Sequence, residues 1–113
     1  MKKIYKKEQT EKLTDYPVQV NKLIRETIEI LDENYGDNRR MRRDLGGYVF
    51  IAENTVDIEM LKIEIVKGLI PEYTDIIECK EGVNWTSSLF LLSSDYSIVV
   101  VCTEELSKYL IER

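Results

Sequence analysis

The longest helical pattern in the chain lies between Asp15 and Gly36. Apolar or small side chains recur every three or four positions on one side of it, and charged side chains occupy most of the other side. The inward-facing members are Val20, Leu23, Ile24, Thr27, Ile28, Leu31 and Tyr35. Asp15 is the expected N-cap, Pro17 suits the first turn, and Gly36 suits the left-handed position after the last turn. We predict a helix of about 19 residues, roughly 28 Å long, which can lie across a small sheet.

The second half of the chain reads as strands separated by short turns. A β-rich run, "YVFI", follows the turn signal of Gly46 and Gly47. Three further runs are "EYTDIIECK" (72–80), "NWTSSLFLL" (84–92) and "YSIVVVC" (96–102). The loops between these three runs are short enough for hairpins, which predicts an antiparallel meander. The last run has almost no polar interruption, which is typical of a strand at the centre of a sheet.

Residues 55–66 carry two competing patterns. Ile58, Leu61 and Ile65 sit at helical spacing, and Asn54 or Thr55 can cap a helix that starts there. The stretch "LKIEIVK" instead alternates at period two, as a strand does. We favour the helix.

A closing helix is predicted over "TEELSKYLIER" (103–113). Thr103 is its expected N-cap, and Glu104 and Glu105 lie near the positive end of the helix dipole. Leu106, Tyr109 and Leu110 are expected to face inward.

The resulting order of elements is helix, strand, helix, three strands, helix. It predicts an α+β fold: a mainly antiparallel sheet of about four strands, a long N-terminal helix packed on one face, and a short C-terminal helix. At 113 residues the chain has the size of one domain, so we expect a single domain over residues 1–113. Residues 1–13 hold few apolar anchors, and we expect a frayed or weakly docked start there.

The composition gives expectations about the environment. The longest apolar runs have four and five residues, far short of the roughly 18 that cross a bilayer, so we expect no membrane contact and a cytoplasmic protein. Cys79 and Cys102 are then expected to be reduced, buried thiols. The chain has no histidine, so a closed zinc site is not expected, and the commonest general base near neutral pH is missing.

The charge is distributed unevenly along the sequence. Residues 1–43 hold eleven Lys or Arg and eight Asp or Glu, whereas residues 44–113 hold five and thirteen, which gives +3 and −8. The candidate partner-binding residues are the four arginines Arg39, Arg40, Arg42 and Arg43. Their guanidinium groups are well matched to carboxylate or phosphate.

Three interpretations of the arginine cluster are open. The leading one is a solvated connector, or pairing with the chain's own acidic residues such as Asp37 and Asp44. The second is a surface for a protein partner. The third is a nucleic-acid contact, in which the cluster and the N-terminal lysines Lys2, Lys3, Lys6 and Lys7 form one positive strip. The sequence pI of about 4.8 disfavours the third.

Catalysis and cofactors are not expected. The serines lack a histidine base, and "SSD" is typical of a turn rather than of a nucleophile elbow. Glu53, Asp57, Glu59 and Glu64 lack the calcium-loop pattern, so we interpret them as a solvated face. Trp85 is expected to complete the core rather than to line a groove. We therefore expect a protein-interaction module, with a nucleic-acid-associated regulator, or an inhibitor that occupies a partner's nucleic-acid-binding site, as the alternatives. A homodimer is a further option.

Two segments, "IPEYTDIIE" and "LFLLSSDYSIVVV", resemble parts of small uncharacterised bacterial proteins carried on mobile elements. The resemblance includes no catalytic or ligand motif and transfers no functional residue. It implies an intracellular bacterial setting and a role in binding.

Overall fold

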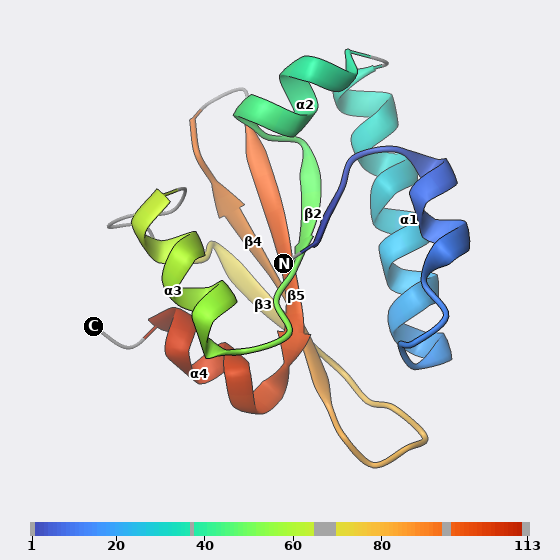
Figure 1. The fold of residues 1–113 in the computed structure, drawn as a ribbon, viewed down its shortest axis with the longest axis vertical. Coiled ribbons are helices and arrows are strands. Elements are labelled where there is room, and N and C mark those ends of the chain that lie inside the picture. The colour runs from blue at the N-terminus through green and yellow to red at the C-terminus, as the bar shows by residue number, and fades with distance from the viewer. Residues whose placement is uncertain (1, 37, 65–69, 94–95, 112–113) are drawn as a thin grey trace.

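The computed structural model describes residues 2–36, 38–64, 70–93 and 96–111. They form one five-stranded sheet with helices on both faces (Figure 1). The elements are β1 (Lys2–Ile4), the 3-10 helix η1 (Lys7–Lys12), α1 (Val18–Tyr35), α2 (Arg39–Leu45), β2 (Tyr48–Ile51), α3 (Thr55–Glu64), β3 (Tyr73–Ile77), β4 (Trp85–Leu91), β5 (Ser97–Thr103) and α4 (Glu104–Ile111). The predicted α+β class is confirmed, including the long first helix and the short last one.

The strand order is β1-β2-β5-β4-β3. Strands β3, β4 and β5 form the predicted antiparallel meander, and β5 lies at the centre with its side chains buried along most of its length. The sheet is nevertheless mixed, because β2 runs parallel to β5, with Tyr48 opposite Ile98 and Ile51 opposite Val101. A parallel neighbour needs a long connection, and here the connection contains α3 and the β3–β4 hairpin.

In place of the frayed or weakly docked start that we expected, the structure has a strand and a 3-10 helix over residues 2–12. Strand β1 pairs antiparallel with β2 and supplies a fifth strand, with Ile4 opposite Val49. After β1, the side chain of Gln9 accepts hydrogen bonds from the backbone N–H groups of Tyr5 and Lys6 and so starts η1. Ile4 and Leu13 are buried at the two ends of this segment. The buried side chains of Ile4 and Leu13 and the backbone pairing of β1 with β2 hold this segment on the sheet, whereas its many lysines had suggested that the segment is solvated.

Helix α1 covers one face of the sheet, on the right of Figure 1. Val20, Ile24, Ile28 and Leu31 are buried against Val49, Ile51, Val99 and Val101 of the sheet, as the helical spacing predicted. Pro17, not Asp15, is the N-cap residue, and no side chain caps this end. At the other end Gly36 has a φ of 67° and a ψ of −157°, so its φ is positive, as glycine permits, but its ψ is not that of the left-handed helical conformation expected for it.

Helices α3 and α4 cover the opposite face, on the left of Figure 1. Phe50, Phe90 and Val100 of the sheet pack there with Ile58, Leu61 and Leu110 of the two helices. The predicted helix over 55–66 is confirmed as far as Glu64, and Ile65 lies outside the described residues. Asn54 caps α3 by accepting a hydrogen bond from the Asp57 N–H at 2.9 Å.

The start of α4 also agrees with the prediction. Thr103 accepts the Leu106 N–H at 3.4 Å as the N-cap, and Leu106 packs against the core on this face. Tyr109 departs from the prediction, because 45% of it is exposed. Within the described residues, no helix is both long and apolar enough to span a bilayer.

Candidate functional site

The arginine cluster is a helix rather than a connector. Asn38 caps α2 by accepting a hydrogen bond from the Met41 N–H at 3.2 Å, and Gly46 follows its last residue. These two residues were the local signal for a helix, and the run of charges between them obscured it. Figure 1 shows α2 across one end of the sheet, beside the C-terminal end of α1.

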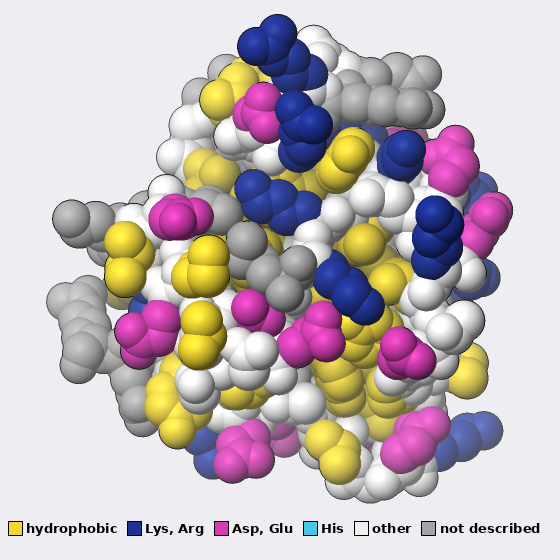
Figure 2. All heavy atoms as spheres, viewed as in Figure 1, with side chains coloured by type: hydrophobic (Ala, Val, Ile, Leu, Met, Phe, Trp, Pro, Cys, Tyr) yellow, Lys and Arg dark blue, Asp and Glu magenta, His cyan; other side chains and the backbone are white. Residues whose placement is uncertain are grey.

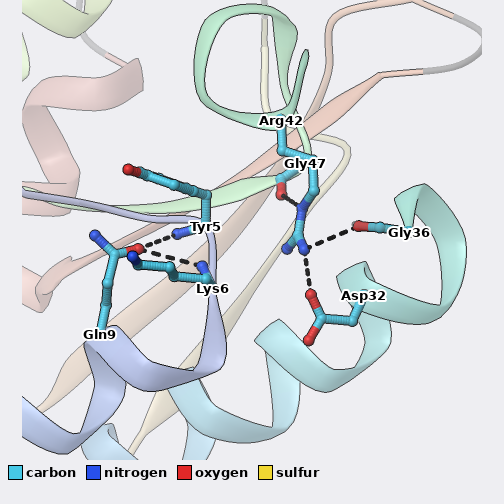
Figure 3. Close-up of polar contacts among 7 residues, drawn as sticks. All are labelled: Tyr5, Lys6, Gln9, Asp32, Gly36, Arg42 and Gly47. Carbon is cyan, nitrogen blue, oxygen red and sulfur yellow. Dashed lines mark hydrogen bonds and ion pairs between the residues drawn. The ribbon is translucent and has the colours of Figure 1, made fainter. Parts of the chain in front are cut away.

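Arg42 points into the protein, and its side chain is only 3% exposed. Figure 3 shows its guanidinium between α2 and the end of α1. Nε donates to the Gly47 carbonyl at 3.0 Å, and Nη1 donates to the Gly36 carbonyl at 3.3 Å and to the Asp32 carboxylate. Three acceptors, from the end of α1 and from the turn before β2, therefore hold Arg42. Its role is structural, and its buried guanidinium is not part of a docking surface.

The other arginines occupy different environments. Arg43 is exposed and its Nε donates to Asp44 Oδ1 at 3.0 Å. This hydrogen bond lowers the pKa of Asp44 and raises the pKa of Arg43. Arg40 is exposed, and the side chain of Arg39 lies outside the described part of the chain. The three arginines whose side chains are described are thus a buried one, one paired with Asp44 and an exposed one, and Asp37, the other acidic residue offered as an internal partner, lies outside the described residues.

Lys3 lies near the exposed arginines, since the charges of Arg40 and Lys3 both lower the pKa of Asp44. Figure 2 shows Lys and Arg side chains in a broken line over α2 and the N-terminal segment, with Asp and Glu between them. Lys2 Nζ lies 3.9 Å from Glu53 Oε1, and Lys7 Nζ lies 3.2 Å from Glu29 Oε1. The positive strip of the third interpretation is therefore interrupted by the protein's own carboxylates, which weakens its attraction for a polyanion.

A second surface, which the sequence patterns did not lead us to predict, lies on α3. Val56, Met60 and Ile63 are 63%, 37% and 70% exposed. Their spacing of four and three residues places them on one side of the helix, and we call them the α3 stripe. Figure 2 shows hydrophobic side chains gathered over α3, at the left of the view. Glu59 and Glu64 are also exposed on this helix.

The signal for the α3 stripe was present in the sequence. Helix α3 has apolar residues on two sides, whereas a helix that covers a sheet needs only one. Ile58 and Leu61 fill the core, and the α3 stripe remains outside. Competition between helical and alternating patterns in this segment obscured the second apolar side.

The cysteines offer little for nucleophilic chemistry. Both thiols are free and buried, as predicted. Burial raises the pKa of Cys102, although a hydrogen bond with Thr86 partly opposes this. Burial also raises the pKa of Cys79, and the charge of Glu81 adds to the rise. A raised pKa leaves little thiolate near neutral pH, and the thiolate is the reactive form.

The remaining candidates for chemistry are structural. Trp85 is half-buried against the core and meets the Tyr16 ring edge-on, with 5.7 Å between the centroids, as expected for a core residue. Asp57 is buried and accepts the Glu53 N–H at 2.9 Å, so it supports the start of α3 rather than belonging to a solvated face. Among the described residues, no three Cys, Asp or Glu side chains gather into a group that could hold a metal ion.

Comparisons of the chain with models of protein families, with curated protein sequences and with solved structures found no match.

Proposed function

We propose that this protein is a non-catalytic, cytoplasmic protein-binding module that docks its partner through the α3 stripe. The observation that carries the proposal is the exposure of three apolar side chains on one side of a helix whose other side is already committed to the core. Apolar side chains gathered on a surface are typical of protein interfaces. The arginines, which the sequence offered as the binding residues, are less suited because Arg42 is buried and Arg43 is paired.

The affinity available from the α3 stripe can be bounded. Burying one large aliphatic side chain completely is worth about 1.5–3 kcal/mol. Since the members of the stripe are only 37–70% exposed, each contributes about 0.5–2 kcal/mol on docking. Association itself costs roughly 4–15 kcal/mol, so the stripe must act together with its surroundings. We therefore expect a reversible complex.

The charges around the stripe define the chemistry of the partner. Glu59 and Glu64 are exposed on the same helix, and the chain after residue 43 carries a net charge of −8. Opposite charges across an interface increase the association rate and exclude wrong partners. The proposed partner therefore presents apolar side chains bordered by Lys or Arg. A nucleic-acid-binding site of another protein is one surface of this kind.

The test compares two variants that lose exposed apolar residues on opposite sides of the sheet, three from α3 and two from α1. The α3 variant carries Val56→Ser, Met60→Ser and Ile63→Ser. The control carries Val18→Ser and Ile30→Ser, which remove residues of α1 that are 75% and 57% exposed on the other side of the sheet. Urea unfolding verifies that both variants fold.

Each protein is used for affinity capture from the native cell, and the captured protein is purified for calorimetry. We expect wild type and the α1 control to bind it alike, and the α3 variant to bind at least thirtyfold more weakly, with affinity falling as salt rises. Equal binding by the α3 variant would refute the proposal. Capture of nucleic acid that is lost on changing Arg40 and Arg43 to Ser would replace it with the alternative.

A further inference from the structure

Strand β3 forms an open edge of the sheet. It is last in the strand order and pairs with β4 alone, from Tyr73 opposite Leu89 to Ile77 opposite Trp85. No described strand pairs with its outer side. The other edge, β1, is three residues long and carries two lysines, which discourage pairing with another chain. Strand β3 has five residues and neither lysine nor proline.

The helices leave both faces of β3 uncovered. Tyr73, Thr74, Asp75 and Ile76 are all exposed, and only Ile77 is half-buried. Because side chains alternate along a strand, the exposed Tyr73 and Ile76 lie on opposite faces. Their exposed fractions are 54% and 59%. An added strand would therefore gain apolar contacts on both faces as well as backbone hydrogen bonds.

The acidic residues near this edge favour a basic strand over a second copy of this chain as the added strand. Glu72, Asp75, Glu78 and Glu81 are exposed, and Lys80 is the one basic residue among residues 72–81. A second copy paired antiparallel and centred on β3 would bring Asp75 opposite Asp75 and acidic ends near one another. Like charges directly opposite each other destabilise a strand pair. A strand that carries Lys or Arg instead meets opposite charge at Asp75 and at the acidic residues that flank β3.

We propose that the edge of β3 accepts an extended, basic segment of a different protein as a sixth strand. Backbone hydrogen bonds supply affinity in this mode of recognition, and side chains on alternate positions supply specificity. Because side chains alternate along a strand, Lys or Arg on one face of the added segment meet Asp75, and Val, Ile or Tyr on its other face pack beside Ile76. This site is separate from the α3 stripe and does not depend on it.

The experiment uses the full chain and two synthetic probes, a peptide of alternating Lys and Val and a peptide of alternating Glu and Val. Amide hydrogen exchange is followed residue by residue. We expect the Lys peptide to slow exchange along Tyr73–Ile77 and the Glu peptide to leave it unchanged. We expect Asp75→Lys to weaken binding of the Lys peptide about three- to tenfold at low salt, and to leave the stability of the fold intact.

Two control variants show whether binding of the Lys peptide depends on the β3 edge itself. Glu105→Lys makes the same charge change at an exposed position on α4, and we expect it to bind the Lys peptide like wild type. The α3 variant also keeps this binding, so failure of the proposed function would not affect the result. Protection elsewhere than β3, or equal protection by both peptides, would overturn the proposal. Protection of β3 that rises with protein concentration alone would assign the edge to a second copy and overturn it too.

Discussion

Replacing Arg42 by Met tests whether a single arginine joins the end of α1 to the turn before β2. The substitution keeps most of the side-chain volume and removes the charge. It leaves the carbonyl groups of Gly36 and Gly47 without their donor, and Asp32 without its partner. Met fits an irregular apolar space well, so the loss comes mainly from the polar contacts.

The magnitude follows from the exposure of the two partners. Breaking a fully buried ion pair costs about 3–5 kcal/mol, whereas an exposed pair contributes about 0–1 kcal/mol. The side chain of Arg42 is 3% exposed, but that of Asp32 is 38% exposed and regains water when the arginine is removed. The expected loss therefore lies between the two limits, at about 2–3 kcal/mol.

Urea unfolding monitored by Trp85 fluorescence measures this loss. With a slope of about 1–3 kcal/mol per molar, the midpoint should fall by about 0.7–3 M. Arg43→Met is the matched control, since Arg43 is the next residue on the same helix and its pair with Asp44 is exposed. We expect no measurable midpoint shift for the control.

Salt distinguishes the two arginines further. Screening acts strongly on exposed charges and weakly on buried ones, so the difference between wild type and Arg42→Met should persist in 1 M salt. Equal small shifts for Arg42→Met and Arg43→Met would refute the argument, as would loss of the difference in high salt. Either result would mean that α2 is held by something other than this arginine.

Three further predictions concern packing, pH and thiol reactivity. Gly47→Ala should lower the free energy of unfolding, measured with urea, by about 2–4 kcal/mol, because φ is +82° and the added Cβ would lie 2.7 Å from the Tyr35 ring of α1. Gly36→Ala has open space around the added Cβ and should lower it by only about 1–2 kcal/mol. Burial raises the pKa of Tyr48 to about 12. The contribution of Tyr48 to the free energy of unfolding is therefore constant below pH 10 and falls by about 2–3 kcal/mol as the pH rises to 12. Unfolding of Tyr48→Phe across this pH range should lack this fall. Cys102, with no exposed surface, should react with a thiol reagent only on unfolding, and Cys79 sooner, whereas rapid native labelling of Cys102 would favour a catalytic thiol.

The fold was largely predictable because its main elements have strong local patterns. Four inward residues of α1 recur at helical spacing, and β5 is an uninterrupted apolar run, so the sequence indicates both the long helix and the central strand. The parallel pairing of β2 with β5 was not predictable in the same way. A hydrophobic pattern identifies a strand and its faces, but the direction of its neighbour depends on the path of the connection.

The candidate site was predictable only in part. Four arginines in five positions are chemically equivalent in the sequence, and only the meeting of α1, α2 and the Gly47 turn decides that Arg42 is the buried one. Strand β1 was hard to predict for the same reason. It has one buried side chain, Ile4, and Ile4 is buried because β1 pairs with β2. Contacts between segments far apart in the sequence leave no local pattern.

The parallel pair at the centre of the sheet also affects how the protein is made. Tyr48 finds its neighbour Ile98 fifty residues further along the chain. During synthesis on the ribosome, β2 therefore emerges well before β5 can pair with its edge. Until then α1 and Val49 lack Val99 and Val101, the β5 side chains that complete their core. The nascent chain presents this apolar surface for several seconds at ordinary elongation rates. Because the contacts of the hairpin of β4 and β5 are local, we expect it to form early and the earlier half of the chain to assemble on it.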